Sequence, residues 1–146
     1  MNQIEGNPTM IVQPYLFFGG RGEEAMAFYK SALGAEVTAL MRYSDSPEPH
    51  PPGMMPPGSE HKVMHAEMRI GDSVVMLSDG QCSGLTEFAG FALPITVADD
   101  AEAQQRFAAL AEGGVVQMPL AKTFFASSFG MLADRFGVPW MILTGP

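Results

Sequence analysis

The chain has 146 residues and a formal net charge of −8, with only 8 Lys and Arg. This argues against a nucleic-acid surface, which needs clustered basic residues, and the single cysteine, Cys82, excludes an internal disulfide or a Cys-based zinc cluster. No apolar run reaches the ~20 residues of a membrane span, and no basic segment leads into an apolar run at the N-terminus. We therefore expect a soluble, cytoplasmic protein without a signal peptide.

The first half reads as strand, helix and three strands. A strand is predicted over residues 11–18, and the following helix has an apolar stripe at Ala25, Phe28, Tyr29, Ala32 and Leu33. Gly34 can take the left-handed conformation that ends the helix. A second strand is predicted over residues 37–43. Residues 44–62 hold six prolines and two glycines, which predicts a long loop.

Two strands joined by a tight turn close this half. Residues 63–70 and 73–78 flank the pair Gly71-Asp72, a strong hairpin signal. After a linker over residues 81–90, the same order is predicted again: a strand over 91–97, a helix over 99–112, a strand over 115–121, and a last hairpin of residues 125–135 and 138–144. The sequence predicts βαβββ twice.

The two halves match as a repeat. Phe28 corresponds to Phe107 and Gly34 to Gly113, a shift of 79 residues, whereas Arg69 corresponds to Arg135 at a shift of 66. The difference of 13 residues has about the length of the proline-rich insertion. Each sheet must hide one face under a helix, so we predict an α+β fold of two βαβββ modules. Their sheets are expected to be curved and mainly antiparallel, with helices outside and a shared concave cavity.

At this point the chain resembles the vicinal oxygen chelate superfamily (glyoxalase, bleomycin resistance, dioxygenase), and within it the PhnB-like branch labelled after 3-demethylubiquinone 3-methyltransferase. The residues that carry the resemblance include PYLFF at 14–18, EEAMAFYKSALGAEV at 23–37 and VMHAEMRIGDSVVMLSD at 63–79, with GFALPITVADDAEAQQRFAALAEGG at 90–114 and MPLAKTFFASSFGMLADRFGVPWMI at 118–142. The match covers nearly the whole chain. It implies one domain over 1–146, with module one at about 10–79, an insertion at 44–62 and module two at about 91–144.

The resemblance also implies where a metal would bind. In metal-using members the four ligands come from the first and last strands of each module, which correspond here to Gln13, Met76, Ala92 and Ile142. Only Gln13 can ligate a hard or borderline cation. We therefore expect no metal at this inherited site and no cofactor.

Strand alternation extends this reasoning to the cavity wall. If Gln13 faces the cavity, Tyr15 and Phe17 do so as well, and on the other strands Arg69, Ser78 and Trp140 follow; these six residues are the predicted ligand-binding set. His65 is the candidate catalytic residue, with Glu67 to orient its imidazole. The alternative is that His65, Glu67 and Arg69 form an ion-paired, solvated strand face. Tyr15 and Trp140 could equally be core residues that do not contact a ligand.

Three other sequence features are weaker indications of a functional site. Gly20-x-Gly22-x-x-Ala25 with Asp45 resembles a dinucleotide fingerprint, but two helices cannot build a doubly wound sheet. His50 and His61 in the proline-rich loop are expected to be surface residues. Met54 and Met55 would form a flexible lid or a partner contact.

Three functional hypotheses remain open. The first is a metal-independent homodimer that binds a small organic molecule, with no nucleic-acid or membrane partner; dimerisation is implied by the resemblance alone. The second is a lyase, isomerase or oxygenase that acts through His65, Glu67 or an unpredicted metal site. The third is a partner-binding protein that uses residues 45–60.

Overall fold

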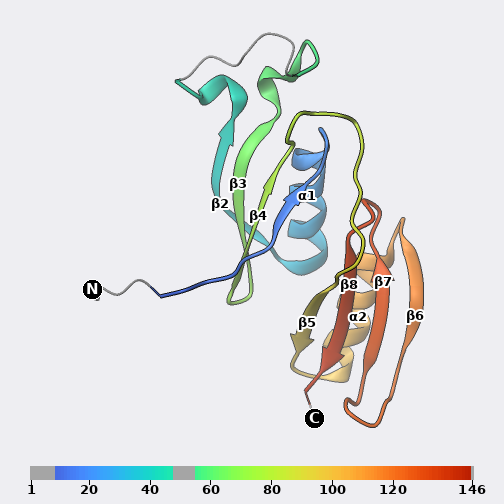
Figure 1. Ribbon diagram of the computed structural model, residues 1–146. Helices are drawn as coiled ribbons and strands as arrows, with labels where there is room; N and C mark the ends of the chain where they lie inside the picture. Colours follow the sequence, from blue (N-terminus) through green and yellow to red (C-terminus); the bar gives the residue numbers. More distant parts are fainter. Residues whose placement is uncertain (1–8, 48–54, 146) are drawn as a thin grey trace.

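The computed structural model describes residues 9–47 and 55–145. Its elements form two units with the same order (Figure 1). The first consists of β1 (Tyr15–Phe17), α1 (Gly22–Leu33), β2 (Glu36–Arg42), β3 (Val63–Ile70) and β4 (Ser73–Ser78), and the second of β5 (Leu93–Val97), α2 (Asp100–Ala111), β6 (Val115–Ala121), β7 (Phe129–Ala133) and β8 (Pro139–Thr144). The predicted βαβββ repeat is confirmed.

Each unit builds one four-stranded sheet, in the order β1-β4-β3-β2 and β5-β8-β7-β6. The first strand of each unit runs parallel to the last one, and the other neighbours are antiparallel. Mainly antiparallel sheets with outer helices were expected, and this is what the chain forms. Neither sheet is of the parallel, doubly wound kind that the dinucleotide fingerprint would require.

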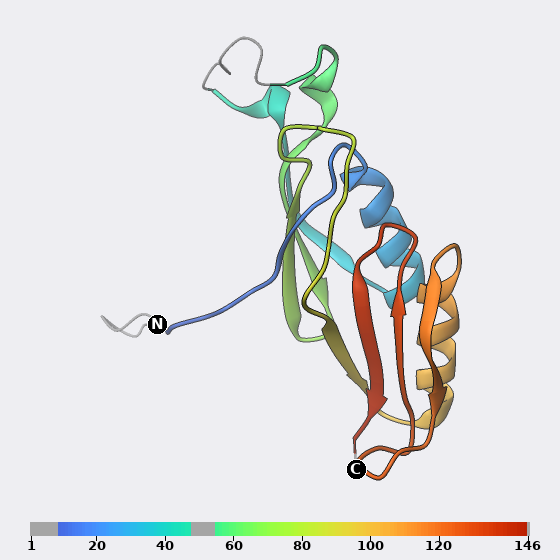
Figure 2. The same cartoon turned by 45° about the vertical axis from the view of Figure 1, so that its right-hand side comes forward.

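One helix covers one face of each sheet, and the helices lie on the same side of the molecule (Figure 2). In β3, Ala66 and Met68 are buried beneath α1, whereas His65, Glu67 and Arg69 alternate toward the open face. In β8, Trp140 and Ile142 are the buried positions. Both sheets therefore keep one face free of helix.

The register of the last strand differs from the predicted one. Leu16 pairs with Leu77 in the first sheet, and its counterpart Ile95 pairs with Ile142 in the second. Leu77 therefore corresponds to Ile142, a shift of 65 residues rather than 66. The β7–β8 connection spans residues 134–138, whereas Gly71-Asp72 suffices between β3 and β4. Because a slip of one residue exchanges the two faces of a strand, the prediction that Trp140 and the inherited metal position Ile142 face the open side is wrong.

The two units are joined through a buried carboxylate. Asp134 accepts a hydrogen bond from the Tyr29 hydroxyl of α1 at 2.5 Å and another from Trp140 Nε1 at 2.9 Å. Its other oxygen accepts the backbone N–H groups of Phe136 and Val138. Burial, together with this carboxylate, raises the pKa of Tyr29, so the phenol stays a donor.

Two cation–π contacts join the two units, and each unit supplies one arginine and one aromatic ring. The Arg21 guanidinium lies 4.5 Å from the ring centre of Phe136, and Arg135 lies 4.3 Å from that of Phe28. The helices also touch, since Arg106 of α2 donates to the main-chain oxygen of Ala32. Polar and aromatic contacts thus fasten one unit to the other.

Within the first unit, Asp79 ties three elements together. Its Oδ1 accepts the N–H groups of Gly20 and Gly22 at the start of α1, and its Oδ2 accepts Val63 N–H at the start of β3. Asp79 is 1% exposed. The glycine donors that a pyrophosphate would need are therefore already bound to a carboxylate of the same chain.

Candidate functional site

A chain of hydrogen bonds crosses the open face of the first sheet. The Tyr15 hydroxyl lies 2.8 Å from His65 Nδ1, and His65 Nε2 lies 3.2 Å from Glu67 Oε2. Tyr15 comes from β1, while His65 and Glu67 are alternate residues of β3. A carboxylate only accepts, so an ionised Glu67 favours the tautomer with the proton on Nε2. In that tautomer His65 Nδ1 accepts a hydrogen bond from the Tyr15 hydroxyl.

Aromatic and apolar side chains lie next to the hydrogen-bonded side chains of Tyr15, His65 and Glu67. The rings of Tyr15 and Phe17 are 5.1 Å apart, and those of Tyr15 and His65 are 5.6 Å apart. Met76 pairs with both Tyr15 and Glu67 across the sheet, so its side chain belongs to the same row. Burial raises the pKa of Tyr15, so the phenol is neutral near pH 7 and can donate or accept.

The other two predicted residues of this sheet, Arg69 and Ser78, lie beside these groups. Ser78 pairs with Phe17 across the sheet, and although burial has the larger effect and raises the pKa of Tyr15, the Ser78 hydroxyl lowers it. Arg69 lies on the open face but pairs with Glu36 of the neighbouring strand, as the solvated-face alternative anticipated. Ser78 is 4% exposed, and its hydroxyl accepts Gly80 N–H. Ser78 therefore supports the turn after β4 and does not present its hydroxyl to solvent.

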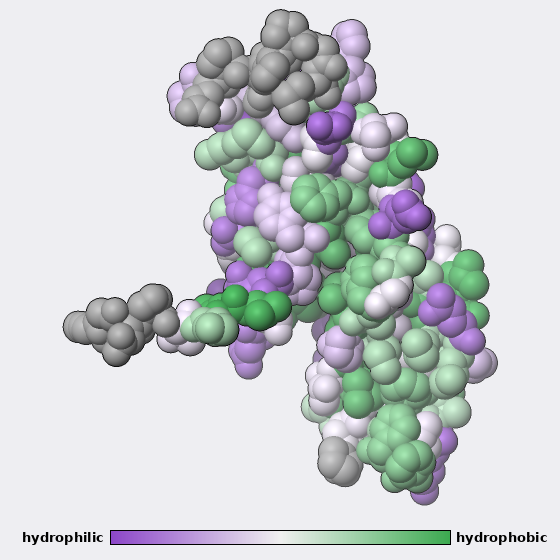
Figure 3. Space-filling view, viewed as in Figure 1, coloured by the Kyte–Doolittle hydropathy of each residue, from purple (hydrophilic) through white to green (hydrophobic). Residues whose placement is uncertain are grey.

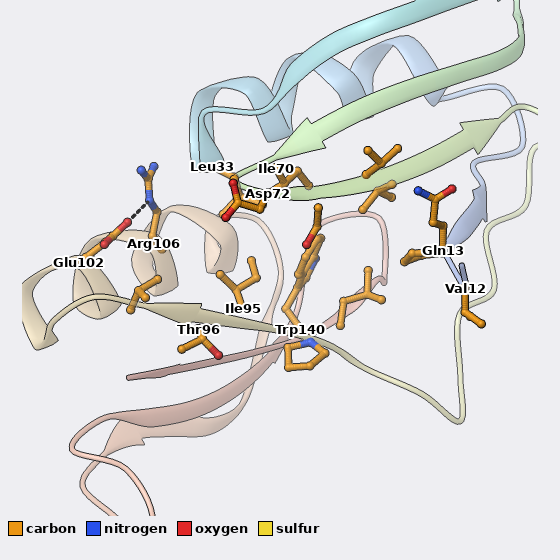
Figure 4. Close-up of a pocket in the computed structure, with 18 of the residues that line it drawn as sticks. Val12, Gln13, Leu33, Ile70, Asp72, Ile95, Thr96, Glu102, Arg106 and Trp140 are labelled. Carbon is orange, nitrogen blue, oxygen red and sulfur yellow. Dashed lines mark ion pairs between the residues drawn. The ribbon is translucent and has the colours of Figure 1, made fainter. Parts of the chain in front are cut away.

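A cavity of about 850 Å³ lies between the two units (Figure 4). Gln13 and Trp140 line it, so these two predicted residues belong to this cavity instead of the Tyr15–His65–Glu67 face. Its other walls come from the β3–β4 hairpin, the edge strand β5 and the Glu102–Arg106 pair of α2. The volume is within the range of small-molecule sites.

The open face of the second sheet carries a row of methionines that the sequence did not reveal. Met118, Met131 and Met141 are direct partners across β6, β7 and β8, and Met141 pairs with Pro94 of β5. In Figure 3 this sheet is broadly apolar, whereas the first sheet mixes polar and apolar surface. Strand pairing was the missing information, because these methionines are far apart in sequence.

The corrected register also moves one inherited metal position. Met141, rather than Ile142, is the counterpart of Met76 on the open face. The set then becomes Gln13, Met76, Ala92 and Met141, and a thioether replaces an alkyl group without adding a ligand for a hard cation. Within the described residues no three His, Cys, Asp or Glu side chains are grouped closely enough to hold a metal.

The structure describes residues 44–47 and 55–62 of the proline-rich loop and all of the linker over residues 81–90. His61 lies in a short 3-10 turn and is exposed, while His50 and Met54 lie outside the described residues. Cys82 is a free, half-buried thiol. No helix in the described part of the chain is long and apolar enough to cross a membrane.

Comparison with known proteins shows the family to which the chain belongs. Residues 10–143 match the model of the family described as 3-demethylubiquinone-9 3-methyltransferase. Protein YjdN of Escherichia coli (strain K12) is 37% identical over 140 residues, which are 91% of this chain and 94% of that protein. The crystal structure of PA1353 from Pseudomonas aeruginosa is 40% identical with a TM-score of 0.80, covering 94% of this chain and 98% of that one.

Two further solved structures have folds similar to that of this chain. A Bacillus cereus PhnB protein, described as a putative 3-demethylubiquinone-9 3-methyltransferase, is 29% identical, with a TM-score of 0.76 over 93% of this chain and 100% of that one. The fosfomycin resistance protein FosX of Listeria monocytogenes shares the fold, with a TM-score of 0.63 at 10% identity over 96% of each chain. The chain therefore belongs to the PhnB-like 3-demethylubiquinone-9 3-methyltransferase family, and it shares its fold with a fosfomycin resistance protein.

Proposed function

We propose that this protein binds a small organic molecule on the open face of the first sheet, around Tyr15, His65 and Glu67. The observation that carries the proposal is the hydrogen-bonded chain of these three side chains beside an exposed aromatic ring, Phe17. Apolar surface with a few convergent polar groups is typical of ligand sites. The half-exposed position of these groups makes a purely structural role in the core a poor explanation.

The ligand site as proposed uses no inherited metal. The four corresponding positions carry one amide, two thioethers and an alanine, which do not suit a hard cation. Phe17 and Tyr15 would stack on a planar part of the ligand, and Met76 would adapt to its shape. Glu67 and the net charge of −8 favour a ligand with positive charge.

A homodimer is part of the proposal. Large apolar side chains are exposed on the open faces of both sheets, among them Met41, which pairs with His65, and Met118, which pairs with Met131. Exposed apolar surface on these faces favours a protein contact. A second copy would cover it and would keep water from the ligand.

Catalysis is the second candidate function, and the Tyr15–His65–Glu67 chain favours it specifically. In one direction, the Tyr15 oxygen would take a proton from the ligand as its own proton passes to His65 Nδ1, with Glu67 hydrogen-bonded at Nε2; in the reverse step, Tyr15 would return a proton to the ligand and regain one from His65. This arrangement would serve a lyase or isomerase that moves a proton. It differs from simple binding only if the ligand is chemically changed.

Ligand binding is tested by native mass spectrometry of freshly purified protein, which reports co-purifying molecules and subunit count together. Small cationic, anionic and neutral aromatic compounds are then screened for a rise in Tm. Phe17→Ala should abolish the rise caused by a hit, whereas Phe91→Ala, at an exposed phenylalanine outside the face, should leave it intact. An equal rise in both variants would refute this location.

The catalytic candidate is tested on each hit by following the compound by mass spectrometry. His65→Ala should abolish any conversion while Tm barely moves, because His65 is half exposed. A ligand that is bound but never altered would leave binding as the function. Conversion that survives in both His65→Ala and Tyr15→Phe would place the chemistry elsewhere.

A further inference from the structure

Residues 9–14 form an arm that leaves the body of the protein. Figures 1 and 2 show this arm projecting away from both sheets. Met10 is 92% exposed, Ile11 66% and Val12 94%, although all three are large and apolar. The sequence predicts a strand from residue 11, yet ladder pairing begins only at Tyr15. The arm therefore has strand-forming composition, and among residues 9–47 and 55–145 it has no strand partner.

The chain leaves the sheet at a proline. The Pro14 carbonyl accepts Met76 N–H at 3.0 Å, and this is the first described bond between the arm and β4. Proline fixes its own φ and restricts the preceding residue, Gln13, to extended backbone. The direction of the arm is thus set by covalent geometry, and the arm is already extended before it meets a partner.

The cavity between the units offers an edge for such a strand. One of its walls is β5, the outermost strand of its sheet, whose outer backbone groups pair with no strand of the described chain. Pro94 and Thr96 of β5 are exposed. Pro94 supplies no N–H, but its carbonyl and the backbone groups of the rest of the strand remain. An extended peptide satisfies such an edge better than a compact molecule does, because it offers backbone groups in series.

We propose that the arm of each subunit in the dimer lies along β5 of the other subunit, inside the cavity between its two units. The opposite wall of the cavity is the base of that subunit's own arm, residues 11–14. A reciprocal exchange would therefore place the two arms side by side between the two β5 strands. This arrangement closes under a two-fold axis and needs no third copy. The partner then contributes Ile11 and Val12 to each cavity.

The inference rests on the proposed dimer, and its test separates the two. Two differently tagged chains are co-expressed in a Cys82→Ser background, one with Ile11→Cys or Val12→Cys and the other with Thr96→Cys. Both arm positions are needed because the register decides which residue faces Thr96. Paired residues of neighbouring strands have Cα atoms about 4.5–5.5 Å apart, which a disulfide can span. Glu112→Cys, exposed at the end of α2, replaces Thr96→Cys as the control.

Mild oxidation should join the two tagged chains when Thr96→Cys is present and not with Glu112→Cys. Ile11→Asp combined with Val12→Asp should weaken dimerisation by about 100-fold, because two buried apolar side chains are replaced by charges. Leu85→Asp, an equally exposed change outside the arm, should leave it unaltered. A dimer without the crosslink, or with undiminished affinity in the double variant, would overturn the arm exchange and leave the dimer. A monomeric native protein would overturn both.

Discussion

Replacing Asp79 by asparagine removes one hydrogen-bond acceptor from a fully buried site. Oδ1 accepts two backbone N–H groups and Oδ2 accepts one, from Val63. The best orientation of the amide keeps its oxygen toward Gly20 and Gly22, and its NH₂ group then faces Val63 N–H. An unsatisfied buried N–H costs about 1–3 kcal/mol. Loss of the negative charge at the start of α1 adds about 0.3–1 kcal/mol.

The free energy of unfolding should therefore fall by about 1.3–4 kcal/mol in Asp79→Asn, which corresponds to a Tm lower by about 3–15 °C for a chain of this size. Calorimetry and denaturant unfolding at a fixed protein concentration measure it. Asp72→Asn removes the same charge at an exposed turn and should change stability by less than about 0.5 kcal/mol. Equal losses in the two variants would refute the role assigned to Asp79.

Three further outcomes follow from the packing. Tyr29→Phe deletes a hydrogen bond to the Asp134 carboxylate and should cost about 1.5–3 kcal/mol in denaturant unfolding. Gly114→Ala would place a Cβ 2.2 Å from a main-chain oxygen of β7 and should cost about 1–3 kcal/mol by calorimetry, whereas Gly145→Ala meets nothing within 4 Å and should be neutral. Two serine hydroxyls lower the pKa of Asp100, so its contribution is present above about pH 4 and is lost as pH falls through its folded-state pKa. Asp100→Asn should accordingly lower Tm at pH 6 and make Tm fall less steeply with pH below pH 4. If Tm falls as steeply in the variant as in the native protein, the hydrogen bonds from Ser127 and Ser128 to Asp100 do not contribute to stability.

Local signals in the sequence were strong enough to predict most elements. Gly71-Asp72 located the first hairpin, and β3, β4 and β6 have the predicted bounds. Both helices ended at the predicted glycines or within one or two residues of them. Strand alternation also placed Tyr15 and His65 on the open face correctly. These features depend on neighbours in the chain, which a sequence displays directly.

The features that failed depend on partners across the sheet. Matching Arg69 to Arg135 aligned the two hairpins just before their turns, yet the second turn is longer, and this displaced the register of β8 by one residue. Trp140 was assigned to the wrong face for that reason. The strand predicted from residue 11 has no strand partner before Tyr15 in the part of the chain that the structure describes, and no local pattern reveals whether a partner is present. The methionine row was missed for the same cause.

The boundary between the two units contains its own optical probe. Trp140 is the only tryptophan, is 2% exposed and donates its indole N–H to the carboxylate that also binds Tyr29 of the other unit. Any separation of the halves would free the indole and shift its emission to longer wavelength. A shift that precedes the loss of far-ultraviolet circular dichroism would mean that the halves separate first, whereas coincident changes would mean that the chain unfolds as a whole.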